Sequence, residues 1–167
     1  AGIIARVRDM AGPRVPEATP IALNGLIEEA MLFLAHELQG QGVTLTLSLA
    51  KDLPPVLADR IQLQQVIVNL AVNAVQAMMS CPGDRRLTVR TLVDEGRVCI
   101  AVEDNGPGIP EDDLHRLFES FFTTKDAGMG MGLPISRSIV EALGGVIGAR
   151  NCEADGACFL VSLPVAS

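Results

Sequence analysis

The chain has 167 residues, of which 49% are hydrophobic and 20% charged, a composition typical of one globular domain with a substantial core. The net charge of −7 and the absence of Trp and Tyr argue against a nucleic-acid-binding protein, which would carry a basic surface and aromatic platforms for stacking bases. The four cysteines (Cys81, Cys99, Cys152 and Cys158) lack C-x-x-C spacing, so we expect reduced, cytosolic thiols and neither a zinc site nor a disulfide framework.

The first eighteen residues are expected to be the end of a helix followed by a linker. Ile3, Ile4, Val7 and Met10 have helical spacing, and the Pro-rich stretch 11–20 comes next. A helix this short is marginal by itself, so we expect it to continue a longer helix in a larger protein. The charges in residues 1–10 do not fit the apolar stretch of a signal peptide.

The main domain is expected over residues 19–167 and begins with short strands around a helix. Residues 19–23 are predicted to form a strand, and Asn24 is predicted to cap a helix that reaches Leu38, with Gly40 beyond its end. Residues 43–49 alternate strictly between apolar and polar types, which predicts a strand with one buried face. A second short strand over residues 56–58 follows two prolines.

Asp59 is predicted to cap a helix that extends to Met79 and carries a row of amide side chains. On a helix the amides fall within an arc of about 80°, beside a broad apolar band. These amides are Gln62, Gln65, Asn69, Asn73 and Gln76. A buried amide without a partner costs about 1–3 kcal/mol, so the row requires a polar partner, which could be a protein segment, a ligand, or a metal with its waters. The amides also make the uncharged stretch 61–83 a poor membrane span.

The second half is expected to supply hairpins, two glycine-rich loops and two helices. Strands over 87–93 and 97–103 flank an Asp-Glu-Gly turn, and a short helix is predicted over 111–118. A helix over 132–143 precedes a last hairpin of strands 146–152 and 158–163. We therefore predict an α+β two-layer sandwich, in which three helices cover one face of a mixed, largely antiparallel sheet, and not a doubly wound Rossmann sheet.

Each glycine-rich loop suits a different part of a nucleotide. Asp104 in DNGPGIP can accept a hydrogen bond from an amino group such as that of adenine, and its glycines allow close approach of a base. The loop GMGMGL, residues 128–133, opens onto a helix, where exposed N–H groups suit phosphates, and Lys125 just upstream adds a positive charge. Neither loop matches the P-loop or the dinucleotide-binding pattern.

The order of these motifs resembles the catalytic, ATP-binding domain of bacterial two-component sensor histidine kinases, a branch of the Bergerat-fold group that includes gyrase, Hsp90 and MutL. NLAVNA (69–74) corresponds to the N box of that family, DNGPGI to the G1 box, FESFFTTK (118–125) to the F box and GMGMGL to the G2 box. The resemblance covers residues 19–164, and its wording is most similar to the nitrogen-regulation and oxygen-sensing kinases.

The resemblance implies a role for each motif. Asn73 would hold Mg²⁺ with Asn69 beside it, Asp104 would bind the adenine amino group, and Lys125 would join the two asparagines in the catalytic set. The other residues expected at the nucleotide are Gly106, Gly108, Ile109, Phe122, Thr123, Thr124, Gly128, Gly130, Met131, Gly132, Leu133 and Cys158. Two positions depart from the family pattern, since Gln76 stands where many relatives have Lys, and Cys158 where relatives often have Thr or Ser.

The implied function is transfer of the γ-phosphoryl group of ATP to a histidine on a separate dimerisation domain, from which a response regulator takes it. The ATP-hydrolysing relatives carry Glu four residues before the Mg²⁺-binding Asn. This chain has Asn69 there, which disfavours an ATP-hydrolysing clamp because an amide cannot act as a base. The other alternative is a degenerate module that binds nucleotide or a partner without catalysis. We expect a cytoplasmic domain without membrane contact, and a phosphoacceptor other than His36, which lies opposite the apolar face of its predicted helix.

Overall fold

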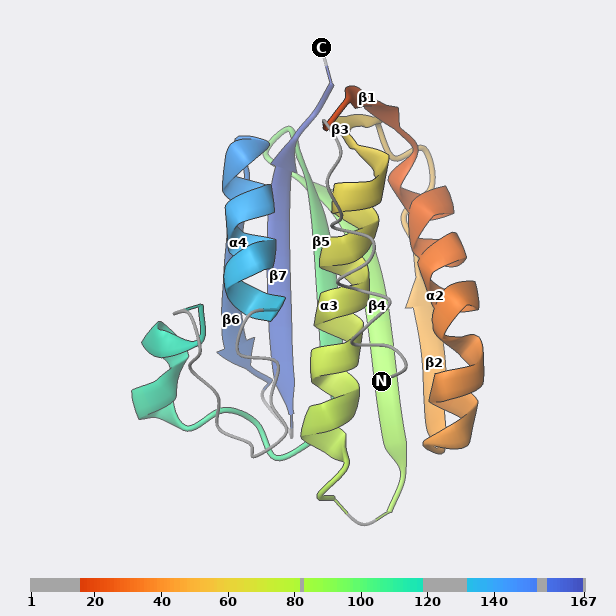
Figure 1. Cartoon of the computed structure of the whole chain (residues 1–167), viewed down its shortest axis with the longest axis vertical. Helices are drawn as coiled ribbons and strands as arrows, with labels where there is room; N and C mark the ends of the chain where they lie inside the picture. The colour runs from red at the N-terminus through yellow and green to blue at the C-terminus, as the bar shows by residue number, and fades with distance from the viewer. Residues whose placement is uncertain (1–15, 82, 119–131, 153–155, 167) are drawn as a thin grey trace.

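The computed structural model describes residues 16–81, 83–118, 132–152 and 156–166, and in this part of the chain three α-helices cover one face of a five-stranded sheet (Figure 1). The strands lie in the order β2-β4-β5-β7-β6. Their bounds are Val43–Ser48 for β2, Arg85–Asp94 for β4, Arg97–Asp104 for β5, Ala157–Pro164 for β7 and Val146–Asn151 for β6. β2 runs parallel to β4, and the other neighbouring pairs are antiparallel.

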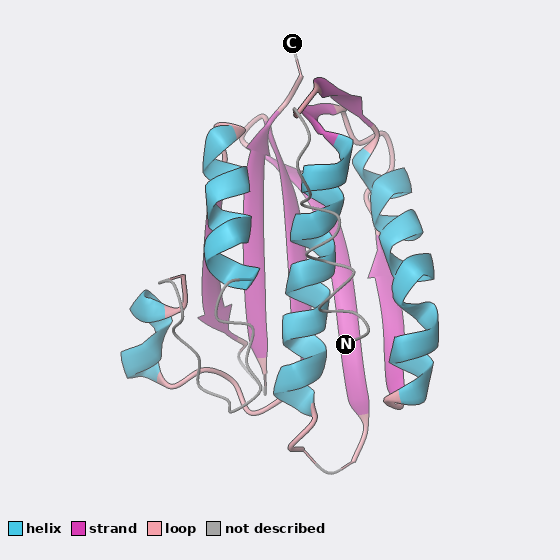
Figure 2. Ribbon diagram, viewed as in Figure 1, coloured by secondary structure: helices cyan, strands magenta, loops and turns pink. Residues whose placement is uncertain are grey.

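The helices are α2 (Leu23–Gly40), α3 (Arg60–Met78) and α4 (Gly132–Ala142), and α3 lies between the other two (Figure 2). A short two-stranded sheet of β1 (Ala18–Ile21) and β3 (Val56–Asp59) lies at the end where α2 and α3 begin. The 3₁₀ helix η1 (Glu111–Arg116) follows β5. The predicted two-layer α+β sandwich with a mixed sheet is confirmed.

The core lies between the helices and the sheet because burial alternates along the strands. In β5, Val98, Ile100 and Val102 are at most 1% exposed and face the helices. The helix that carries the amide row supplies the centre of the core, and its fully buried apolar side chains include Leu63, Val66, Ile67, Leu70 and Ala74. Fully burying one large apolar side chain contributes about 1.5–3 kcal/mol, so this layer holds the site residues on a rigid support.

The two predicted helix caps differ in outcome. The Gln62 N–H donates to Asp59 Oδ1 at 3.0 Å, so the cap of α3 is confirmed. The prediction for Asn24 is wrong, because α2 already begins at Leu23 and Asn24 binds the end of the sheet instead. Its Nδ2 donates to the Ala50 carbonyl at 2.8 Å, and its Oδ1 accepts from Thr91 Oγ1 at 2.9 Å. These tertiary partners replace the local cap.

Two sets of predicted segments lie outside the described residues: the N-terminal helix end with most of its linker, and most of the F box and G2 box. Among the helices that the structure does describe, none has the length and apolar character that crossing a membrane requires.

Candidate functional site

A pocket of about 460 Å³ lies between the C-terminal half of α3 and the loop that follows β5. This volume is within the range of about 300–1,000 Å³ that small-molecule sites occupy. Its described lining comes from one face of α3, the loop after β5, the end of η1 and the start of β7: Asn73, Ala77, Ser80, Asp104, Pro107, Gly108, Ile109, Pro110, Leu117, Ala157 and Phe159. The loop over residues 104–110, which was predicted to hold the base and is called the base loop below, thus meets the amide helix α3 at one cavity.

Asp104 is the last residue of β5 and is held in one orientation by the backbone around it. Its side chain is buried, and its Oδ1 accepts from the Gly106 N–H at 2.8 Å and from the Ala157 N–H at 3.3 Å. Hydrogen bonds from backbone N–H groups to a carboxylate are charge-assisted and position it firmly. A carboxylate fixed in this way at a pocket wall is suited to accept a hydrogen bond from an amino group of a ligand.

The loop after β5 requires glycine because other backbone segments approach it closely. Gly108 has a φ of +85°, and a Cβ on Gly106 would lie 3.1 Å from the Ala77 carbonyl oxygen of α3. The start of the loop is tied to β4 by Asn105, whose Nδ2 donates to the Asp84 carbonyl at 3.0 Å and whose Oδ1 accepts from the Arg86 N–H at 2.8 Å. The loop is therefore preorganised on both α3 and the sheet.

The two N-box asparagines, four residues apart on α3, have different surroundings. Asn73 is partly exposed and lines the pocket, whereas Asn69 is 1% exposed and binds α4. Asn69 Nδ2 donates to the Gly132 carbonyl and to Ser136 Oγ, both at 3.2 Å. Because a carbonyl only accepts hydrogen bonds, this contact fixes which end of the amide is the nitrogen.

Asn69 Oδ1 is buried and has no hydrogen-bond partner in the described part of the chain. Such an oxygen costs about 1–3 kcal/mol unless a ligand satisfies it, and amide oxygens are ligands that Mg²⁺ accepts. The described residues contain no cluster of three or more His, Cys, Asp or Glu side chains that could hold a metal. A cation beside α3 would accordingly be held by side-chain amide oxygens and by oxygen atoms of a bound ligand. The amides present on α3 are compatible with Mg²⁺.

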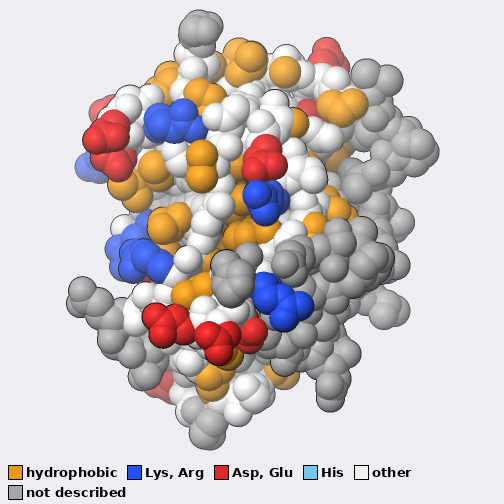
Figure 3. All heavy atoms as spheres, turned by 90° about the vertical axis from the view of Figure 1, so that its left-hand side faces the viewer, with side chains coloured by type: hydrophobic (Ala, Val, Ile, Leu, Met, Phe, Trp, Pro, Cys, Tyr) orange, Lys and Arg blue, Asp and Glu red, His pale blue; other side chains and the backbone are white. Residues whose placement is uncertain are grey.

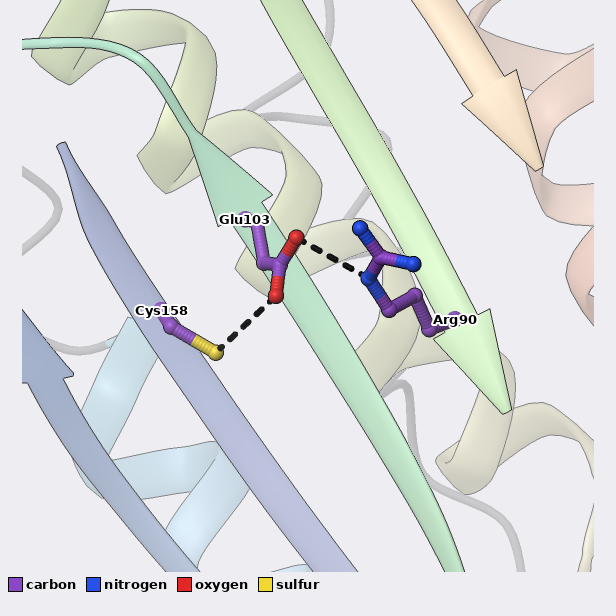
Figure 4. A network of polar contacts seen from close by, with 3 residues as sticks. All are labelled: Arg90, Glu103 and Cys158. Carbon is purple, nitrogen blue, oxygen red and sulfur yellow. Dashed lines mark hydrogen bonds and ion pairs between the residues drawn. The ribbon is translucent and has the colours of Figure 1, made fainter. Parts of the chain in front are cut away.

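Cys158 does not lie where the family resemblance suggested. Its neighbours Ala157 and Phe159 line the pocket, so the alternation of β7 directs Cys158 to the opposite face of the sheet. There its Sγ lies 4.0 Å from Glu103 Oε2, and Arg90 Nε donates to Glu103 Oε1 at 3.1 Å (Figure 4). Burial raises the pKa of the Cys158 thiol to about 11. Ala157 takes the pocket position that we predicted for Cys158.

The remaining predicted residues divide into those that the structure places and those that it does not describe. Ile109 lines the pocket, and Gly132 and Leu133 are buried at the start of α4, where Gly132 contacts Asn69. Phe118, the first residue of the F box, packs edge-on against Phe159 with ring centroids 6.4 Å apart. Phe122, Thr123, Thr124, Lys125, Gly128, Gly130 and Met131 lie outside the described residues.

Several pocket residues were not identified from the sequence, among them Ala77, Ser80 and Leu117. Ala77 and Ser80 continue the face of Asn73 at spacings of four and three, a helical signal that could have identified them. The face of the molecule that carries η1 shows acidic side chains gathered in its lower half (Figure 3), and the first turn of η1 contains Glu111, Asp112 and Asp113.

Residues 58–167 match the family described as "Histidine kinase-, DNA gyrase B-, and HSP90-like ATPase". The chain is 39% identical over 168 residues to the sensor histidine kinase TmoS of Ectopseudomonas mendocina, a match that covers 99% of this chain and 17% of that protein. It is 42% identical over 164 residues to the sensor protein FixL of Bradyrhizobium diazoefficiens, with 98% and 32% covered. The chain thus spans only a minor part of the length of these relatives.

Solved histidine kinase structures share the fold. The catalytic domain of histidine kinase ThkA superimposes with a TM-score of 0.80 at 31% identity, over 89% of this chain and 96% of that one. ThkA in complex with the response regulator protein TrrA gives 0.79 at 28% identity, over 98% and 46%. Full-length ShkA in complex with AMPPNP gives 0.77 at 29% identity, over 99% and 35%.

Because an independent family match covers the same segment as the amide helix, the base loop and the layered fold, the chain belongs to the histidine kinase-, DNA gyrase B- and HSP90-like ATPase family, on the branch of the sensor histidine kinases.

Proposed function

We propose that the chain is the catalytic domain of a sensor histidine kinase, which binds ATP with Mg²⁺ and donates the γ-phosphoryl group to a histidine on a separate helical domain. The observation that carries the proposal is the shared pocket of Asp104 and Asn73, which come from different elements and present a fixed carboxylate and a side-chain amide to one cavity. The complex of ShkA with AMPPNP, an ATP analogue, supports nucleotide as the ligand of that cavity.

Each end of the pocket has a defined task in this proposal. Asp104, held by the Gly106 and Ala157 N–H groups, accepts a hydrogen bond from the adenine amino group. Asn73 and the Asn69 Oδ1, which has no partner among the described residues, hold Mg²⁺, which neutralises the charge of the triphosphate. Lys125 and the G2 box are proposed to contact the phosphates, on the basis of the family resemblance alone.

Transfer to a protein side chain suits this pocket better than hydrolysis. Among the described lining residues, Asp104 is the one ionisable side chain, and backbone donors hold it. Asn69 stands where hydrolytic relatives carry a base, and its amide nitrogen is engaged with α4. The described walls therefore offer no base for activating water, whereas phosphoryl transfer needs mainly positioning and charge neutralisation.

The proposal implies partners beyond this chain. His36 is exposed on α2 and is not among the described lining residues, so the acceptor is proposed to be a histidine of a dimerisation domain. Residues 1–18 are proposed to be the end of one of its helices and the linker that follows. The complex of ThkA with TrrA supports a response regulator as the next partner. A cytoplasmic location is proposed with these partners.

Calorimetric titration with AMPPNP, with and without Mg²⁺, tests the proposal. The unmodified chain is expected to bind saturably, Asp104→Asn to bind about 10- to 150-fold more weakly, and Asn73→Ala to bind more weakly with a smaller gain from Mg²⁺. Adding the dimerisation helices in trans with ATP then tests transfer to histidine. If the unmodified chain binds no nucleotide at millimolar concentration, the kinase hypothesis is refuted in favour of a non-catalytic module.

A further inference from the structure

The carboxamide of Asn151, at the end of β6, holds the backbone of Ile109 with both of its polar groups. The Ile109 N–H donates to Asn151 Oδ1 at 2.7 Å, and Asn151 Nδ2 donates to the Ile109 carbonyl at 2.9 Å. A strand residue in an antiparallel sheet exchanges the same two hydrogen bonds with its neighbour. β6 is an edge strand of the sheet, so the Asn151 side chain joins this edge to the base loop by a strand-like pair of hydrogen bonds.

The contact lies directly behind the pocket wall. A Cβ on Gly108 would lie 2.9 Å from Asn151 Oδ1 and 3.5 Å from its Cγ, so the carboxamide packs against the backbone that precedes Ile109. Gly108 and Ile109 both line the pocket, whereas Asn151 is not among the lining residues. Within the described residues, Asn151 therefore bears on the pocket through the position of this wall and not as a lining side chain.

The hairpin end that carries Asn151 also orients Asp104. Asn151 pairs with Ala157 in the register of β6 and β7, and the Ala157 N–H donates to Asp104 Oδ1 at 3.3 Å. The Cys152 N–H donates to the Gly156 carbonyl at 2.9 Å and closes the hairpin beyond this pair. One pair of residues, Asn151 and Ala157, thus sets the distance between the carboxylate and the opposite side of the base loop.

We infer that Asn151 is a positioning residue for base recognition, which sets the separation between Asp104 and the Gly108–Ile109 wall and so the affinity and selectivity for the purine base. This inference rests on the proposed nucleotide-binding function. An exposed Asn that only stabilises the hairpin would change thermal stability and leave the choice of base unaltered. Selectivity between ATP and GTP, which share the triphosphate, separates these two roles.

The test compares Asn151→Ala and Asn151→Asp with the unmodified chain, in titrations with ATP and GTP, each with and without Mg²⁺. Asn151→Ala removes both hydrogen bonds and is expected to weaken ATP binding about tenfold and to reduce the preference for ATP over GTP. Asn151→Asp keeps the shape but places a second acceptor against the Ile109 carbonyl, so it is expected to bind ATP at least as weakly. The gain from Mg²⁺ should stay unchanged in both, because the proposed metal ligands are on α3.

Asn24→Ala is the matched control. It removes two comparable hydrogen bonds, to Ala50 and from Thr91, near the start of α2, and Asn24 is not among the described lining residues. The start of α2 and the loop that follows β5 lie at opposite ends of the molecule (Figure 1). It should lower the melting temperature and leave the affinities for ATP and GTP unchanged. This pattern would show that losing a buttressing carboxamide does not by itself change nucleotide selectivity.

The outcomes are distinguishable. If the unmodified chain binds no ATP, the proposed function is refuted, and the role of Asn151 with it. If the unmodified chain binds ATP but both Asn151 variants keep its affinity and its preference over GTP, only the positioning role is overturned. Equal losses for ATP and GTP that follow the drop in melting temperature, as a purely structural role predicts, would also overturn it.

Discussion

Gly156 is the position where one added methyl group is expected to damage both the fold and the site. Its φ is +98°, and a Cβ there would lie 1.8 Å from the Asp104 carbonyl oxygen, 2.6 Å from its carbon and 2.9 Å from the Asn105 Cα. All three are backbone atoms, so no side-chain rotation relieves the overlap. In Gly156→Ala the hairpin of β6 and β7 must move away from the end of β5 to make room for the methyl group.

The cost follows from these two features. Overpacking a closely packed position costs about 1–3 kcal/mol, and a left-handed conformation costs an L-residue about 1–2 kcal/mol more. The free energy of unfolding should therefore fall by about 2–5 kcal/mol, which for a domain of this size lowers the melting temperature by roughly 5–20 °C. Because the movement separates Ala157 from Asp104, affinity for ATP with Mg²⁺ should fall as well.

Thermal unfolding by circular dichroism and calorimetric titration with ATP measure both effects. Gly148→Ala is the control, since Gly148 lies in β6 of the same hairpin, has no positive φ, and a Cβ added there would meet nothing within 4 Å. That variant should stay within about 0.5 kcal/mol of the unmodified chain. A Gly156→Ala protein with the melting temperature and ATP affinity of the control would refute the close approach of Gly156 to Asp104.

Further predictions concern the two ends of the site and the opposite face of the sheet. Asp104→Asn should weaken ATP binding by about 10- to 150-fold, the worth of a hydrogen bond to a charged group, with little change in melting temperature. Ser136→Ala removes one of the two described hydrogen bonds of Asn69 and should lower the free energy of unfolding by about 1 kcal/mol. It should also reduce the gain in ATP affinity that Mg²⁺ provides. An unchanged gain would show that Ser136 does not influence the proposed metal site. Burial raises the pKa of Cys158 from 9.0 to about 11, so the folded state keeps this proton longer than the unfolded state. Stability should therefore fall as the pH rises from 9.0 to about 11, and denaturant titrations of Cys158→Ala should show a shallower loss over that range; equal slopes would contradict it.

The features that local patterns determine were predictable from the sequence. The amide row and apolar band of α3 repeat every three to four residues, and Asp59 caps the helix through a contact only three residues away. Strict alternation and turn residues likewise located the strands. Such signals depend on neighbours along the chain, so they do not require the fold to be known.

Contacts between distant segments decided the rest. Asn69 and Asn73 share one helix face, but only the packing of α4 determines that the first binds Gly132 and Ser136 while the second lines the pocket. A shift of one residue in a strand exchanges its two faces, which is why Ala157 and not Cys158 lies in the pocket. Asn151 reaches Ile109 across 42 residues, a pairing that no periodicity encodes. Residue types and their order thus indicated the candidate site and the chemistry expected there. The orientation of each described side chain, in contrast, followed from long-range packing, which exists only once the sheet and helices have assembled.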